Sequence, residues 1–125
     1  MTEFITNIQK YIDTIDICKV KMPTQKIFAV LTHNTETNKY TIILNINKKT
    51  IKQQCNSIIH ELLHYHNGDL IIRNKNINLI EQHTHELEKY YRKHIPNNIK
   101  KYIIQKIKQS NIYDAKTGKK LPCRQ

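Results

Sequence analysis

The chain has 125 residues, enough for one domain that buries its core without disulfides. Its three cysteines are odd in number and lack C-x-x-C spacing, which argues against a disulfide framework or cysteine zinc site and favours a reducing compartment. The net charge of +11, from 21 Lys and Arg against 10 Asp and Glu, raises the possibility of a nucleic-acid partner. We attribute the charge mainly to a composition rich in Ile, Asn and Lys, and do not favour nucleic acid.

The first ten residues lack the apolar core of a signal peptide, and no later segment is apolar for long enough to cross a bilayer. We therefore expect a soluble, intracellular protein without a membrane partner. Apolar residues recur at helical spacing over residues 2–15, which predicts an N-terminal helix. From residue 16 to 22, Cys18, Val20 and Met22 alternate with lysines, as in a half-buried strand.

A hairpin follows this strand. Its arms are two apolar, β-branched runs at 26–32 and 40–47, separated by a polar stretch. The next helix has clear ends, because Thr50 and Gln53 have capping-box spacing and Gly68 stands where a left-handed C-cap is favoured. We place this helix from about residue 51 to 66. Its apolar residues form one stripe, by which we expect it to pack: Ile51, Cys55, Ile58, Ile59 and Leu62.

This capped helix carries the pattern H-E-x-x-H, at His60, Glu61 and His64. Residues four apart on a helix share a face, so the two histidines can bind one metal ion while Glu61 stands beside it. On the helical projection the histidines lie opposite the apolar stripe. The pattern also arises by chance on exposed amphipathic helices, so its context has to decide.

A zinc hydrolase needs a third protein ligand and a position left open for water. Another helical pattern begins at Ile77 and must end before Pro96, and we expect the ligand on it. The candidates are Glu81, His83, His85, Glu86 and Glu88. Glu81 and Glu88 lie at the edge of the apolar stripe, whereas Glu86 projects to solvent. Because His85 follows Glu81 by four residues, Glu81 can ligate while His85 hydrogen-bonds a ligand or the substrate.

The C-terminal region is the most basic part of the chain. Ile99, Ile103 and Ile107 predict a last helix whose other faces carry lysines. Residues 115–125 contain four basic residues with a Gly and a Pro, and we expect them to form a basic, flexible tail. The tail could touch DNA, but no helix-turn-helix or zinc-finger pattern accompanies it.

The order of these motifs resembles the ImmA/IrrE-type metallopeptidases, a gluzincin family, and most closely their short stand-alone members encoded by phages, prophages and conjugative elements. The resemblance covers roughly residues 26–96. It rests on Leu44-Asn45 at the end of the hairpin, the capped helix with His60-Glu61-Leu62-Leu63-His64, Asn67-Gly68-Asp69, and Ile80-Glu81-x-x-x-His85. His85 replaces the Asp of the best-known gluzincins, which leaves it open between outer partner, substrate contact and ligand.

The resemblance implies an α+β, zincin-like metallopeptidase domain over residues 1–114. Its expected parts are an N-terminal helix, a three-stranded, mostly antiparallel sheet with a hairpin, the H-E-x-x-H active-site helix, a ligand-bearing helix and a C-terminal helix. The implied function is a zinc-dependent metalloendopeptidase, with Zn²⁺ on His60, His64 and Glu81, Glu61 as general base and His85 as a second catalytic residue. The implied substrate is a protein, a DNA-binding repressor of a phage or mobile element in the bacterial cytoplasm.

The sequence leaves alternatives for the oxyanion-stabilising residue and for the function. Tyr65, His66, His85 and Tyr90 are the candidates for stabilising an oxyanion. A peptide substrate would add as a strand along residues 40–47. Two other functions compete: a catalytically silent zincin-fold module that binds a protein partner, and a small basic nucleic-acid-binding protein whose H-E-x-x-H is accidental. The substrate's identity and the oligomeric state leave no readable pattern.

Overall fold

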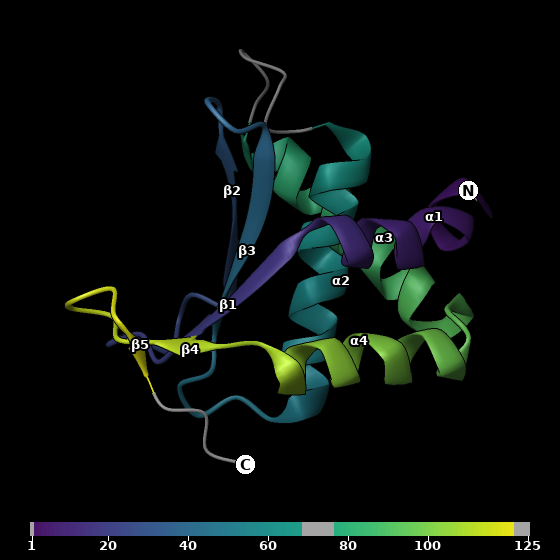
Figure 1. Cartoon of the computed structure of the whole chain (residues 1–125). Helices are drawn as coiled ribbons and strands as arrows, with labels where there is room; N and C mark the ends of the chain where they lie inside the picture. Colours follow the sequence, from purple (N-terminus) through teal and green to yellow (C-terminus); the bar gives the residue numbers. More distant parts are fainter. Residues whose placement is uncertain (1, 69–76, 122–125) are drawn as a thin grey trace.

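Four helices and five strands make up the described part of the chain, residues 2–68 and 77–121, in a computed structural model of the protein (Figure 1). The helices are α1 (Thr2–Thr14), α2 (Ile51–Asn67), α3 (Ile77–His94) and α4 (Asn97–Gln109). The strands are β1 (Asp16–Val20), β2 (Ala29–Asn34), β3 (Lys39–Asn45), β4 (Ile112–Tyr113) and β5 (Lys120–Leu121). This composition confirms the α+β class, the four expected helices and the hairpin. None of the described helices is long and apolar enough to cross a lipid bilayer.

The strands form one mixed sheet in the order β2-β3-β1-β4-β5. β2 and β3 pair antiparallel, whereas β1 is parallel to both β3 and β4. The prediction of a three-stranded, mostly antiparallel sheet was therefore wrong. The reason is that β3 inserts between β2 and β1, antiparallel to the one and parallel to the other. The first part of the expected tail, residues 115–121, forms the turn after β4 and then β5, which pairs with β4; residues 122–125 lie outside the described residues.

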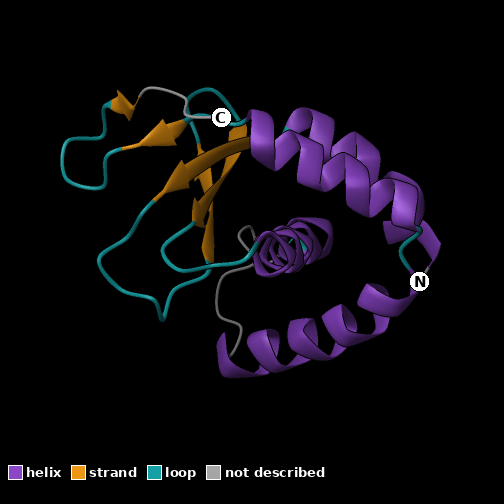
Figure 2. Ribbon diagram, turned by 90° about the horizontal axis from the view of Figure 1, so that it is seen from below, coloured by secondary structure: helices purple, strands orange, loops and turns teal. Residues whose placement is uncertain are grey.

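The two faces of the sheet differ, because the helices lie on one side of it (Figure 2). The core therefore lies between that side and the helices. On β1, Ile17 and Lys19 are buried, while Cys18 and Val20 are half-buried. This is the reverse of the predicted alternation. Ile17 pairs with the fully buried Ile42 of β3, which fixes the inward face of both strands.

Helix α2 lies at the centre of the molecule. Figure 2 views it nearly along its axis, with the sheet, the pair α1 and α4, and α3 around it. Its capping box is present in full, since Thr50 and Gln53 exchange side-chain-to-backbone hydrogen bonds, and Gly68 caps the other end at φ 70°. The expectation that α2 packs by one face was wrong. With neighbours on several sides, it also buries residues off the stripe, among them Leu63, Glu61 and His64.

Candidate metal centre

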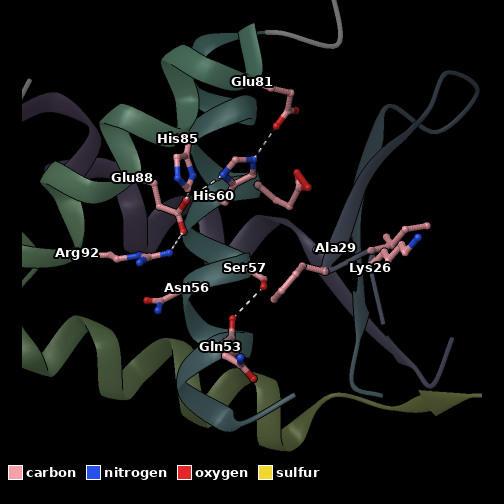
Figure 3. Close-up of a pocket in the computed structure, with 13 residues that line it drawn as sticks. Lys26, Ala29, Gln53, Asn56, Ser57, His60, Glu81, His85, Glu88 and Arg92 are labelled. Carbon is pink, nitrogen blue, oxygen red and sulfur yellow. Dashed lines mark hydrogen bonds and ion pairs between the residues drawn. The ribbon is translucent and has the colours of Figure 1, made fainter. Parts of the chain in front are cut away.

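The side chains of His60, His64 and Glu81 converge where α2 meets the first turns of α3; Figure 3 shows His60 and Glu81. The Nε2 atom of His64 lies 2.9 Å from Glu81 Oε1, and Nε2 of His60 lies 3.2 Å from Glu81 Oε2. The two Nε2 atoms are 3.2 Å apart. One ligand atom from each residue falls within 4.8 Å of the others. The structure thus brings together the three residues predicted as ligands, and their binding of a metal stays a prediction.

The spacing of buried residues on α3 explains how Glu81 reaches this position. Thr84, Glu88 and Tyr91 are buried at helical spacing and face the rest of the protein. Glu81 stands one turn before Thr84 at the edge of that face, so its side chain is 54% exposed yet contacts both histidines of α2. The predicted projection of Glu86 to solvent is confirmed, because Glu86 is exposed.

A buried carboxylate, Glu88, orients His60 from behind. Its Oε2 accepts from Nδ1 of His60 at 3.2 Å, and its Oε1 accepts from Arg92 at 2.7 Å. Burial alone would raise the pKa of Glu88, but these hydrogen bonds and the two positive partners outweigh it and hold that pKa below its ordinary value. A proton kept on Nδ1 leaves the Nε2 lone pair free for a cation. From the sequence we considered Glu88 only as a possible ligand and did not predict that it would orient His60. Its spacing of seven residues from Glu81 does place the two carboxylates on one face of the helix.

Glu61 follows His60 on α2 and is buried, with 7% of it exposed. Burial, with a smaller contribution from Glu81 and Glu88, raises the pKa of its carboxyl to about 7, although His60 and His64 oppose the shift. For His60, burial would lower the pKa, but the hydrogen bond to Glu88 and the surrounding carboxylates raise it. Glu61 is therefore a buried carboxyl that can change protonation state near neutral pH, beside the candidate ligands.

These groups line one end of a cavity of about 420 Å³. Its floor is α2, one wall is α3, and the other wall is the segment that leads into β2 (Figure 3). The lining residues are Lys26, Ile27, Phe28, Ala29, Gln53, Asn56, Ser57, His60, Glu61, Glu81, His85, Glu88 and Arg92. The cavity therefore extends from the three converging side chains toward the N-terminus of α2.

Comparisons with protein-family models, with curated proteins and with solved structures give no match to this chain. We therefore infer the function from the geometry of the site residues. Two imidazole nitrogens and a carboxylate oxygen form the ligand set of the His₂Glu class of catalytic zinc site, which keeps a position open for water. Here two members of that set, His60 and Glu81, line the cavity, and so does the buried carboxyl of Glu61. The residues present fit a zinc ion, and the arrangement suits activation of a water molecule.

Of the four residues considered for the oxyanion, His85 lines the cavity and the other three do not. Tyr65 packs edge-on against Tyr11 and Tyr40, and His66 exchanges a hydrogen bond with the Tyr11 hydroxyl. Tyr90 stacks on His94. Nδ1 of His85 lies 3.5 Å from Glu88, so it belongs to the site without joining the three converging residues. Asp69, part of the motif after the active-site helix, lies outside the described residues.

The expected docking strand also needs correction. Residues 40–47 fall largely on β3, which is paired on both sides, with β2 and with β1. A peptide cannot add to a strand whose two edges are occupied. The edge strand next to the cavity is β2, whose first residue, Ala29, belongs to the cavity wall.

Proposed function

We propose that this protein is a zinc-dependent metallopeptidase of the ImmA/IrrE type, which hydrolyses a peptide bond in a protein substrate. The observation that carries the proposal is the convergence of His60, His64 and Glu81 at one end of a cavity that Glu61 also lines. Neither competing function needs a buried carboxyl beside three converging ligand-type side chains, two of which line a cavity.

Each of these residues has a role in the proposed reaction. A zinc ion bound there would lower the pKa of a water molecule and polarise the scissile carbonyl. Glu61 would take a proton from the attacking water and deliver it to the leaving nitrogen, as general base and then general acid. Glu88 holds the ring of His60 in place through Nδ1. To His85, which lines the cavity on α3, we assign the hydrogen bond to the oxygen that gains charge.

The edge strand supports a peptide as the substrate. An extended peptide can add to β2 by main-chain hydrogen bonds, while α2 forms the floor beneath it. The resemblance described above suggests the target, a DNA-binding repressor of a phage or mobile element in a bacterial cytoplasm.

The test combines metal content with proteolysis. We expect the purified protein to bind near-stoichiometric zinc, measured by elemental mass spectrometry, and to cut a mixture of random-sequence peptides, measured by the new termini it creates. The Glu61→Gln variant keeps the size of the side chain but cannot accept the proton. It should therefore retain zinc and lose cleavage by about a hundredfold or more, the usual contribution of general acid–base catalysis.

Each failure has a distinct meaning. If the purified protein contains no zinc, the proposal loses its basis, and the H-E-x-x-H pattern is a chance match. Zinc-loaded protein that cuts nothing, with or without Glu61, points to the catalytically silent binding module. A Glu61→Gln variant that cuts as fast as the wild type contradicts the assigned role of Glu61.

A further inference from the structure

Two large apolar side chains stand open to solvent in the wall that faces α3. Ile27 is 44% exposed and Phe28 is 45% exposed, and both line the cavity that contains His60 and Glu61. Other large apolar side chains of the same region, such as Leu31 and Ile42, are buried in the core. Exposed apolar surface inside a cavity, next to groups able to do chemistry, is characteristic of a ligand-binding wall.

The segment that presents this pair is held from beneath by Asn45, which is fully buried. The Asn45 amide donates to the carbonyls of Thr24 at 2.8 Å and Ile27 at 2.7 Å, and its oxygen accepts from the N–H of Met22 at 3.1 Å. Its backbone N–H donates to the carbonyl of Phe28 at 3.0 Å. These bonds fix the segment, so the two apolar side chains are kept at the cavity and do not collapse into the core.

Lys49 secures the same segment from outside. Its Nζ lies 3.7 Å from the centre of the Phe28 ring and also donates to the carbonyl of Gln25. A ring held on one side by a cation offers its remaining surface to a ligand without first having to be ordered. Such preorganisation favours binding, because less conformational entropy is lost when the ligand arrives.

The length of the cavity limits what can occupy it. Along α2 it reaches from His60 back to Gln53, about 10 Å of helix at the standard rise per residue (Figure 3). An extended chain covers that distance with about three residues. A nucleic acid would need a line of basic groups along the cavity, but Lys26 and Arg92 are the two basic residues among its lining residues. They lie on opposite walls, and Arg92 is paired with Glu88, while Lys49 holds Phe28 from outside the cavity. An extended peptide fits both the length and the apolar surface.

We infer that this wall selects the substrate: Ile27 and Phe28 take a large apolar side chain of an extended peptide, about three residues or fewer from the scissile bond. The inference rests on the proposed peptidase function and names its substrate class. Large apolar side chains are usually buried in folded proteins. The segment that is cut would therefore lie in an exposed linker or a locally unfolded region of the target.

The test measures peptide binding apart from cleavage. The probes are fluorescent octapeptides of Ala and Ser with one Phe, Leu, Ser or Glu placed at each position in turn. They are titrated by fluorescence anisotropy against zinc-loaded Glu61→Gln protein, which should bind without cutting. At one position we expect the Phe and Leu peptides to bind at least about tenfold more tightly than the Ser peptide.

Substitution of the wall then locates the preference. Phe28→Ala, or Ile27→Ala as a second variant, should reduce the tenfold preference to about twofold or less. Val30→Ala is the matched control, because Val30 is also exposed and apolar but does not line the cavity, and it should keep the preference. The inference is overturned if Phe and Ser peptides bind alike at every position, or if Phe28→Ala and Val30→Ala behave alike. Selective binding without cleavage by the wild type would instead contradict the proposed function alone.

Discussion

The two walls of the cavity are built from different kinds of structure. The α3 wall presents Glu81, His85, Glu88 and Arg92 at successive helical turns, linked by hydrogen bonds and ion pairs to one another or to α2. The opposite wall is an irregular segment with two apolar side chains at its centre, and its shape depends on Asn45 of β3. One wall is ordered by its own backbone and the other by a distant residue.

In the proposed peptidase, this difference would separate the residues that act in the reaction from those that select the substrate. Groups that must meet at fixed distances lie on two packed helices, whose geometry allows little variation. The residues proposed to select the substrate, Ile27 and Phe28, lie on an irregular segment outside these helices, and such segments tolerate changes in sequence more readily. Variants of one wall should therefore leave the function of the other intact, and three predictions follow in order of decreasing effect.

The largest effect is expected from Glu81→Ala, which removes a predicted ligand from the α3 wall. Zinc affinity, measured by competition with a chromogenic chelator, should fall by more than the roughly tenfold to hundredfold loss typical of an outer partner. His85→Ala and Glu86→Ala are the controls on the same helix and should retain nearly all of the affinity. A loss seen with His85→Ala in place of Glu81→Ala would move the third ligand to His85.

The Asn45→Asp substitution should remove the hydrogen bonds that hold the opposite wall in place. The new carboxyl loses the two donor bonds to Thr24 and Ile27 and faces their carbonyl oxygens in a fully buried position. We expect the free energy of unfolding, from urea titration, to fall by about 3 kcal/mol. Asn47→Asp is the matched control, because the Asn47 side chain donates one bond, to the carbonyl of Met22, and should cost about 1 kcal/mol. Equal losses in the two variants would show that Asn45 does not organise the wall.

The smallest effect is expected from Glu88→Gln, which tests whether a change in the α3 wall affects zinc affinity without affecting peptide preference. The amide can still accept from Nδ1 of His60 but carries no charge to hold the proton there. Zinc affinity should fall by about tenfold, the lower end of the range for such partners. The peptide preference at Ile27 and Phe28 should not change, because neither residue is hydrogen-bonded to Glu88. A changed preference would mean that the two walls are coupled.

The helical part of this site was readable from the sequence because helices are governed by local rules. The capping box at Thr50, the left-handed Gly68 and the spacing of His60 and His64 all follow from residues a few positions apart. The position of Glu81 follows from the same periodicity on α3. The strong local signals predicted which side chains meet, and the structure brings them together.

The rest depends on contacts between distant parts of the chain. No local pattern reveals that Asn45 holds residues 22–28, since its partners lie about twenty positions away. The pairing of β1 with β3 skips over β2, and β4 and β5 are two residues long each, too short for any periodicity. For the same reason the edge strand was misplaced, because edges are decided by the order of strands and not by their sequence.

The position of the candidate ligands on two helices has a consequence for folding. His60 and His64 belong to α2 and Glu81 to α3, so a zinc ion bound by all three would tie the two helices together. An ion that binds the folded chain but not the unfolded one stabilises it by mass action, about 2.7 kcal/mol when free zinc is a hundred times the dissociation constant. A strong chelator would then act on this protein as a mild denaturant. The supply of zinc would then affect the stability of the fold as well as the proposed activity.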